Sequence, residues 1–346
     1  MMLAHGKSRG PHLRVLTWHV HGSYLYYLSQ LPHTFYVPVK PGRPAGYGGR
    51  PADRDWSNNL SEVPADDVHK LDIDVILFQS PGPYEIDQYQ ILSQEQRRLP
   101  QIYLEHDPPR SAPTDTVHIV DDPTVLLVHV THFNALMWDN RRTPVRVVRH
   151  GVIVPPDSRY SGDIARGLVV VNDLSKRGRR LGRDIFEYVR ARVPLDLVGM
   201  GSKALGGLGE VPAQSLPALM ARYRFLFNPI RYTSLGLAVC EAMAVGVPVI
   251  GLATTEMASV IRNGVSGYVY TDVDQMVSRM RELIAQRDRA RMLGEGARRY
   301  AATYFSLARF ARDWESAFAA SIRLRSGLDY TLGSGDLNEQ ANCTYK

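Results

Sequence analysis

Cysteine is scarce in this chain. Only two cysteines occur in 346 residues, Cys240 and Cys343, too few for a disulfide framework, so a reducing cytoplasmic location is expected. Histidines and carboxylates are scattered without the paired or helical spacing of metal ligands, so no metal site and no metal cofactor are expected.

Long apolar runs are also missing. No uninterrupted apolar stretch approaches membrane-spanning length, and the N-terminus lacks the apolar core of a signal peptide. We therefore expect a protein that does not cross a bilayer and is not exported by that route.

Common nucleotide and nucleophile motifs are absent. The first apolar run is followed by one glycine, Gly22, instead of a dinucleotide fingerprint, and there is no Walker loop or nucleophile elbow. A dehydrogenase is thus disfavoured. A helix that begins after Gly22 would still offer backbone N–H groups to an anion.

Positive charge is concentrated in the second half of the chain. Residues 1–157 hold 15 Lys and Arg against 17 Asp and Glu, whereas the remainder holds 26 against 18. Such an excess suits phosphates or an anionic membrane surface. No nucleic-acid module accompanies it, so no nucleic-acid partner is expected.

Short apolar runs alternate with helical patterns, which predicts an α/β protein with two doubly wound parallel sheets in series. The runs are 13–18, 34–37, 74–78, 102–105, 125–130 and 145–148, then 168–171, 195–198, 225–227, 247–250 and 268–270. A turn-rich stretch, 151–162, separates the two groups. We expect domains at 1–157 and 158–320, and a tail at 321–346 that packs back on the first domain or is disordered.

One segment, 41–59, interrupts this pattern. It is rich in glycine and proline and carries Tyr47 and Trp56. Loops this long inside compact domains are usually functional or disordered. Tyr47 and Trp56 are therefore candidates for contact with a ligand.

The segment 228–251 is the most informative. It predicts a buried strand end, a hydroxyl-rich turn, a short helix capped by Thr233 or Ser234 and ended by Gly246, and a second buried strand. The helix N-terminus is suited to an anion. Glu241, a carboxylate in an apolar stretch, indicates a hydrogen-bonding role, since burial of a charge is costly.

His106 closes one of the predicted strands of the first half. Polar residues at the carboxyl ends of parallel strands face the ligand crevice, so His106 is a candidate catalytic residue. A structural, hydrogen-bonded histidine under the following proline turn is the alternative.

The combination resembles the retaining glycosyltransferases of family 4, the group 1 glycosyltransferases, which have the GT-B fold of two Rossmann-like domains facing across a cleft. Its most specific parts are Ser234-Leu235-Gly236-Leu237, Glu241-Ala242-Met243-Ala244 and Gly246-Val247-Pro248-Val249-Ile250, followed by Thr255-Glu256 and the stretch 263–269. The resemblance covers about 13–318.

The resemblance implies a role for each matching residue. Glu241 would hold the nucleotide ribose, and backbone amides at Leu235 and Gly236 would meet the donor sugar and diphosphate. His106 would contact the transferred sugar, Gly22 would lie in the loop over the phosphates, and Val211 would lie where the base is recognised. Donor-binding candidates are Gly22, Lys176, Arg177, Arg180, Val211, Thr233, Ser234, Leu235, Gly236 and Glu241.

Two departures from the family pattern concern the donor. Thr233 replaces the first glutamate of the family's pair, which contacts donor-sugar hydroxyls, and Asn172-Asp173 stands in place of a diphosphate-binding arginine. Lys176, Arg177 or Arg180 would then supply the positive charge.

The function implied is metal-independent transfer of a sugar, with retention, from a nucleotide sugar to a glycan or lipid-linked acceptor, as in bacterial polysaccharide biosynthesis. Tyr47 and Trp56 would then be acceptor-binding residues, so deletion of the segment 41–59 should impair transfer but spare donor binding. The expected location is cytoplasmic, with peripheral contact at an anionic inner membrane face. The alternatives are a non-catalytic nucleotide-sugar-binding or scaffold protein and a GT-B-fold nucleotide-sugar epimerase.

Overall fold

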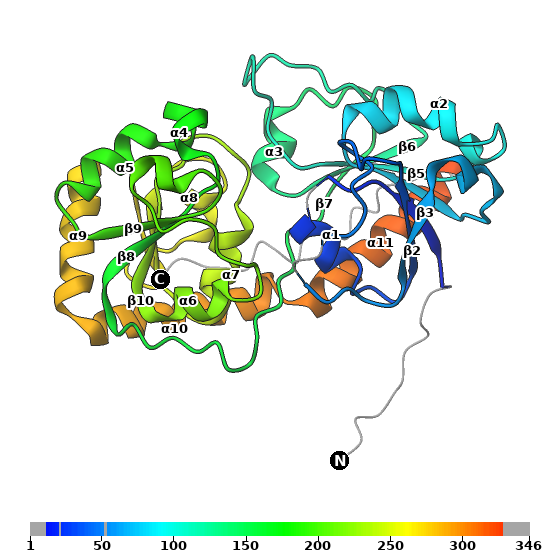
Figure 1. Ribbon diagram of the computed structural model, residues 1–346. Coiled ribbons are helices and arrows are strands. Elements are labelled where there is room, and N and C mark those ends of the chain that lie inside the picture. The colour runs from blue at the N-terminus through cyan, green and yellow to red at the C-terminus, as the bar shows by residue number, and fades with distance from the viewer. Residues whose placement is uncertain (1–11, 21, 52–53, 328–346) are drawn as a thin grey trace.

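The computed structural model describes residues 12–20, 22–51 and 54–327, which form two lobes, each built on a parallel sheet (Figure 1). The first sheet has the order β3-β2-β1-β4-β5-β6-β7 and the second the order β12-β11-β10-β8-β9. Every strand pair in both sheets is parallel. The predicted fold class, two parallel sheets with crossover helices, is confirmed.

The strands of the first sheet are β1 (Arg14–Thr17), β2 (Thr34–Val39), β3 (Leu60–Pro64), β4 (Val75–Phe78), β5 (Gln101–Glu105), β6 (Val125–His129) and β7 (Val145–Val147). Those of the second are β8 (Ile164–Val170), β9 (Leu195–Val198), β10 (Tyr223–Asn228), β11 (Val249–Leu252) and β12 (Gly267–Tyr270). Each predicted apolar run forms one of these strands. The sequence missed β3, a half-exposed edge strand that pairs only with β2 and therefore lacks a continuous apolar run.

The α-helices of the first lobe are α1 (Gly22–Leu28), α2 (Gln88–Ile91) and α3 (His132–Met137), accompanied by the 3-10 helices η1 (Ala65–Lys70) and η3 (Gln96–Arg98) and the π-helix η2 (Pro83–Asp87). The second lobe has α4 (Leu174–Arg177), η4 (Gly178–Leu181), α5 (Arg183–Arg190), η5 (Ser202–Leu205), α6 (Leu216–Arg222), α7 (Leu237–Val245), α8 (Met257–Val260), α9 (Val273–Ala285) and α10 (Arg287–Tyr304). The last helix is α11 (Leu307–Arg325).

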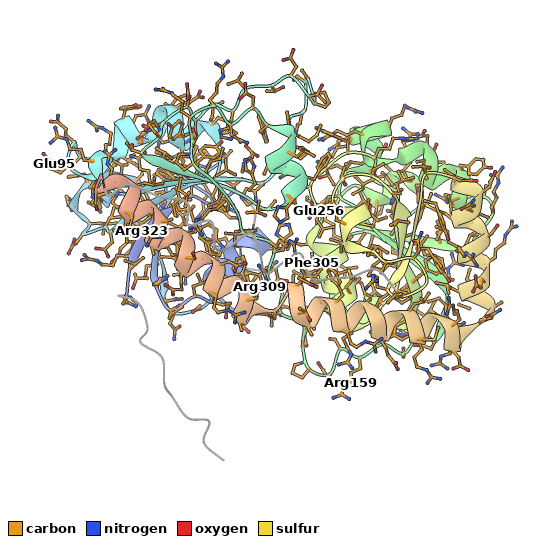
Figure 2. The ribbon with its side chains drawn as sticks, turned by 180° about the vertical axis from the view of Figure 1, so that it is seen from behind. Glu95, Arg159, Glu256, Phe305, Arg309 and Arg323 are labelled. Carbon is orange, nitrogen blue, oxygen red and sulfur yellow. The ribbon has the colours of Figure 1, made fainter. Side chains whose placement is uncertain are left out.

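The chain crosses between the lobes twice. The first crossing is the segment between β7 and β8, and the second is the corner between α10 and α11, where Figure 2 shows Phe305 and Arg309. Beyond this corner, α11 packs on β5 and β6 of the first sheet. The return to the first lobe thus begins at Leu307, earlier than the boundary at 320 suggested by the sequence. The rest of the expected tail, 328–346, lies outside the described residues.

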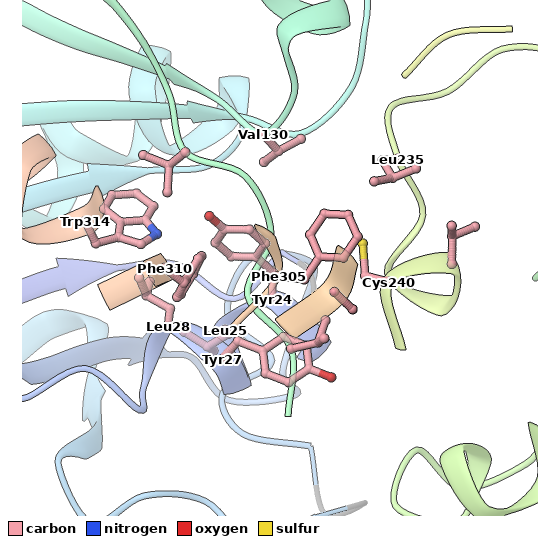
Figure 3. Close-up of a cluster of buried hydrophobic side chains, with 14 of the residues drawn as sticks. Tyr24, Leu25, Tyr27, Leu28, Val130, Leu235, Cys240, Phe305, Phe310 and Trp314 are labelled. Atoms are coloured by element: carbon pink, nitrogen blue, oxygen red, sulfur yellow. The ribbon is translucent and has the colours of Figure 1, made fainter. Parts of the chain in front are cut away.

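An apolar cluster continues across both lobes (Figure 3). Tyr24 and Tyr27 from α1 meet Phe305 and Phe310 from the second crossing, and Leu235 and Cys240 approach from the other lobe. Since these side chains are almost fully buried, the two lobes share one core at their junction. No helix in the described part of the chain is both long and apolar enough to cross a membrane.

Candidate functional site

A cleft of about 740 Å³ lies between the lobes. Its walls combine the carboxyl ends of β8, β9 and β10 with the start of α7 and two residues of the first lobe. The lining residues are Ser23, Arg54, Val170, Val171, Asn172, Arg177, Leu181, Val198, Gly199, Met200, Glu210, Val211, Pro212, Ala213, Leu216, Ile230, Thr233, Gly236, Leu237, Ala238 and Glu241. This is where open parallel sheets bind ligands.

Helix α7 points its N-terminus into the cleft, since Gly236, Leu237 and Ala238 line it. The expected cap was wrong: Gly236, with extended backbone, occupies the N-cap position and no side chain caps the helix. The first-turn N–H groups and the positive end of the dipole therefore face the cleft. Gly246 ends the helix in the left-handed conformation (φ 94°), as predicted.

The Glu241 carboxylate reaches across the lobe boundary. Its Oε1 atom accepts a hydrogen bond of 2.6 Å from the hydroxyl of Tyr27, which lies on α1 of the first lobe. Burial raises the pKa of Glu241, whereas the Tyr27 hydroxyl and the nearby Arg54 guanidinium act to lower it. The hydrogen-bonding role predicted for this carboxylate is confirmed, although its partner, Tyr27, was not foreseen.

Arg54 brings positive charge into the cleft from the segment 41–59. Its Nη2 donates to Ser23 Oγ at 3.3 Å, and its guanidinium lies over the Tyr26 ring, 5.0 Å from the centroid. Both partners belong to α1, so α1 positions Arg54 at the wall opposite α7.

Of the three basic residues proposed for the donor, only Arg177 lines the cleft. The Lys176 side chain is 82% exposed and its Nζ lies 3.3 Å from Asp173. Arg180 lies off the cleft. Burial and the nearby charges of Arg177 and Arg110 lower its pKa, and its carbonyl accepts from the backbone N–H groups of residues 231 and 232.

His106 lies outside the cleft lining, buried at the end of β5. Its Nε2 is 3.0 Å from Gln79 Oε1, and its ring packs edge-on against Tyr24 with centroids 4.9 Å apart. Gln79 Nε2 donates to Thr17 Oγ1 and to the Trp18 carbonyl. Gln79 therefore ties together the carboxyl ends of β1, β4 and β5 and orients the histidine.

The two aromatic candidates for the acceptor have structural surroundings. Tyr47 is 4% exposed and packs in the first lobe's core, with Lys40 over its ring. Trp56 donates from Nε1 to the Pro51 carbonyl at 2.7 Å and packs edge-on against Tyr26. Both side chains anchor the segment 41–59, so the structure gives no support to direct acceptor contact by Tyr47.

The remaining candidates surround the start of α7 and α1. Leu235 is buried in the shared core, and its carbonyl accepts a 2.9 Å hydrogen bond from His150 Nε2. Ser234 is also buried. Gly22 begins α1 beside Ser23, and a Cβ atom there would approach Pro51 Cγ to 3.3 Å.

The cleft thus unites five of the predicted residues: Arg177, Val211, Thr233, Gly236 and Glu241. It leaves His106, Gly22, Lys176, Arg180, Ser234, Leu235, Tyr47 and Trp56 outside its lining. Sequence reasoning missed Ser23, Tyr27 and Arg54. Ser23 and Tyr27 follow Gly22 in the predicted anion-facing helix, which was the available signal. Within the described ranges, no group of three or more His, Cys, Asp or Glu side chains is placed to hold a metal ion.

Comparison with known proteins finds similarity to one family over part of the chain and similarity to solved structures over most of the fold. Residues 183–286 match the family described as glycosyl transferases group 1. No curated protein matches the chain significantly.

Three solved structures illustrate the likeness in fold. Sucrose-phosphate synthase from Thermosynechococcus elongatus has 13% identity and a TM-score of 0.63 over 89% of this chain and 100% of its own. A glycosyltransferase from Rickettsia africae has 12% identity and a TM-score of 0.63 over 90% and 99%. HepE from Anabaena, solved with UDP, has 13% identity and a TM-score of 0.60 over 90% and 100%.

At these identities the likeness establishes the architecture alone. The chain therefore has the GT-B fold, and residues 183–286 of its second lobe are similar to the group 1 glycosyl transferases.

Proposed function

We propose that the protein is a retaining glycosyltransferase that uses a nucleotide sugar without a metal ion. The observation that carries this proposal is the make-up of the cleft, where the α7 N-terminus, Arg177 and Arg54 converge beside Glu241. The leaving group of such a reaction is a nucleoside diphosphate. Preorganised N–H dipoles and guanidinium groups stabilise the charge that develops on its phosphate oxygens.

Five residues in or near the cleft have a proposed task. Glu241 binds the ribose hydroxyls, and the segment at Val211 binds the base. Arg177 and Arg54, one from each lobe, hold the diphosphate. Arg54 thus supplies the charge expected from Lys176 or Arg180, neither of which lines the cleft. His106, oriented by Gln79, approaches the transferred sugar after donor binding has brought the lobes together.

In the proposed step, the bond between the anomeric carbon and the diphosphate oxygen breaks. A new bond forms on the same face between that carbon and an acceptor hydroxyl oxygen, and the acceptor proton passes to the leaving phosphate. Residues 158–304 then form the donor domain, and residues 1–157 together with α11 form the acceptor domain. The acceptor is a glycan or a lipid-linked glycan, reached in the cytoplasm, with the basic second lobe near an anionic membrane face.

The deciding experiment is a thermal-shift screen with UDP-, GDP-, ADP- and dTDP-sugars, followed by analysis of the products. Binding to the folded state raises the melting temperature. We expect one nucleotide class to stabilise the protein, and its sugar to be transferred with retained configuration. The absence of any shift, or an inverted product, would contradict the proposal.

Thr233, in place of a carboxylate at the sugar end of the cleft, favours the second candidate, a nucleotide-sugar-binding protein without catalysis. That candidate predicts donor binding with neither transfer nor donor hydrolysis. An epimerase would isomerise the donor with no acceptor present, which the same product analysis detects.

A further inference from the structure

A second, separate pocket of about 460 Å³ lies where the two crossings meet. We call it the hinge pocket. Its lining residues are His132, Arg146, Val147, Val148, Arg149, Thr303, Tyr304, Arg309, Asp313 and Ser316. None of them lines the donor cleft, and neither the family segment nor the proposed transfer gives them a task.

Positive charge dominates this pocket. Three guanidinium groups face one carboxylate, Asp313, and that carboxylate is already paired with Arg309 Nη1. Arg309 also donates from Nη2 to the carbonyls of Arg149 and His150, at 2.8 and 2.6 Å. These contacts hold the Arg309 guanidinium in place. Its ion pair also occupies Asp313, the only acidic side chain among the residues that line the pocket.

Arg149 is the group best placed to receive a ligand. Its guanidinium lies over the Tyr304 ring, 5.6 Å from the centroid, and forms no ion pair with any carboxylate of the described residues. Arg146 adds positive charge to the same pocket and donates to Ser316 Oγ at 3.0 Å. Burial and the Arg149 charge lower the pKa of His132, so this neighbour is a neutral hydrogen-bonding group near neutral pH.

We propose that the hinge pocket binds the phosphate group of a small phosphorylated molecule. Guanidinium forks match phosphate oxygens bidentately, and the volume suits a ligand of the size of a sugar phosphate. An added dianion also relieves the mutual repulsion of arginines gathered around one carboxylate.

The position of the pocket links its occupancy to the donor cleft. Arg149 lies at the start of the first crossing, and Tyr304 and Arg309 flank the second. A phosphate held among them bridges the two crossings and so favours closure of the lobes over the donor. A ligand that favours closure strengthens nucleotide binding, and the coupling is reciprocal.

The first test measures binding without any nucleotide. Inorganic phosphate and glucose 6-phosphate are titrated into the full chain by calorimetry at constant ionic strength, with chloride as reference. We expect saturable binding that Arg149→Gln abolishes. Arg142→Gln is the matched control, since Arg142 pairs with Asp121 on an exposed turn outside the pocket. Arg177→Gln excludes phosphate binding in the donor cleft.

Three outcomes overturn the proposal: no saturable binding, equal binding by wild type and Arg149→Gln, or loss of binding only in Arg177→Gln. Vesicles with and without phosphatidic acid form a further arm. Vesicle binding that depends on Arg149, with no response to soluble phosphates, would assign the pocket to a lipid headgroup and overturn the small-ligand proposal.

The second test measures coupling. With the nucleotide identified by the thermal-shift screen, phosphate should tighten nucleotide binding about fivefold or more in wild type. It should have no effect in Arg149→Gln, whose affinity without phosphate stays unchanged. If no nucleotide binds at all, the proposed function fails while the first test still stands. If nucleotide binds but phosphate leaves its affinity unchanged, the coupling fails alone.

Discussion

Glu241 shows how one side chain serves both stability and ligand binding. Its carboxylate is placed among apolar neighbours on α7, and the Tyr27 hydroxyl is the partner that compensates for its burial. Burial disfavours the charged form of the carboxyl group, and for that reason it raises the pKa of Glu241.

Glu241→Gln should therefore preserve or increase stability while it weakens nucleotide binding. Glutamine still accepts the Tyr27 hydrogen bond but carries no charge. The native state of wild type binds a proton more tightly than the unfolded state does, so wild type loses stability as the pH rises above the ordinary range of a glutamate.

Thermal melts of both proteins at several pH values test this expectation. The difference in melting temperature should widen from pH 4 towards pH 7. Tyr27→Phe is the control, since it leaves the carboxylate without its partner and should destabilise the protein by about 1 kcal/mol. A wild type that is more stable than Glu241→Gln at pH 7 would contradict the argument.

Arg54 provides a second prediction for a single residue. If Arg54 and Arg177 hold the diphosphate from opposite walls, Arg54→Ala should weaken the binding of the nucleoside diphosphate about tenfold or more. Binding of the corresponding nucleoside should be unaffected, because it carries no phosphate.

Arg43→Ala is the matched control for Arg54. Arg43 lies in the same segment but pairs with Glu62 away from the cleft. Calorimetry with the diphosphate and the nucleoside on all three proteins gives the comparison. Equal loss of both ligands in Arg54→Ala would point to a displaced loop rather than a lost charge.

Among the elements, α7 combines two glycines with opposite requirements. A Cβ atom on Gly236 would meet no atom within 4 Å, and its backbone is extended, so a side chain there would project into open cleft space. A Cβ on Gly246 would also find room, but its φ of 94° disfavours any other residue.

Gly236→Val should thus keep the melting temperature and lose nucleotide affinity, since its side chain occupies the space in front of the helix N-terminus. Gly246→Ala should do the reverse, with a loss of about 1 kcal/mol in stability and unchanged affinity. Denaturant unfolding and nucleotide titration of both variants separate the two effects. A destabilised Gly236→Val with normal affinity would place the ligand away from α7.

The structure indicates a different role for the segment 41–59 from the one expected from sequence. Tyr47 and Trp56 anchor it, and it carries Arg54 into the donor cleft. Its deletion is therefore expected to impair donor binding, in contrast to the expectation from sequence alone.

The elements show which parts of the molecule can be read from sequence. Buried parallel strands leave continuous apolar runs, and the helix at 237–245 leaves a carboxylate in apolar surroundings, so both were predictable. The edge strand β3 leaves no such signal. Arg54 and Tyr27 were missed because their importance arises from contacts between the lobes, which no local pattern encodes.

For the whole molecule, the first crossing passes α11 at one very close approach. A Cβ atom at Gly151 would lie 2.4 Å from Phe310 Cβ, so only glycine allows the linker to pass α11 at this distance. Gly151→Ala should displace α11 from its packing position on the first sheet and destabilise the protein by about 1 to 3 kcal/mol.

This change should loosen the contact between the lobes as well as lower stability. Small-angle scattering should report a larger radius of gyration for Gly151→Ala, and the Arg149-dependent phosphate response should weaken. Gly82→Ala, at a position with open space and a helical backbone (φ −52°), is the control for a general effect of glycine replacement. Unchanged scattering with full stability would show that the crossing tolerates the methyl group.

The return of α11 to the first sheet also fixes the order in which the protein can be completed during synthesis. Strands β5 and β6 leave the ribosome about 200 and about 180 residues, respectively, before the helix that covers them. Until the second lobe has been synthesised, the apolar face of the first sheet that α11 covers remains exposed. A chain truncated before Leu307 would therefore be exposed to aggregation through its N-terminal half, although every residue of that half is present.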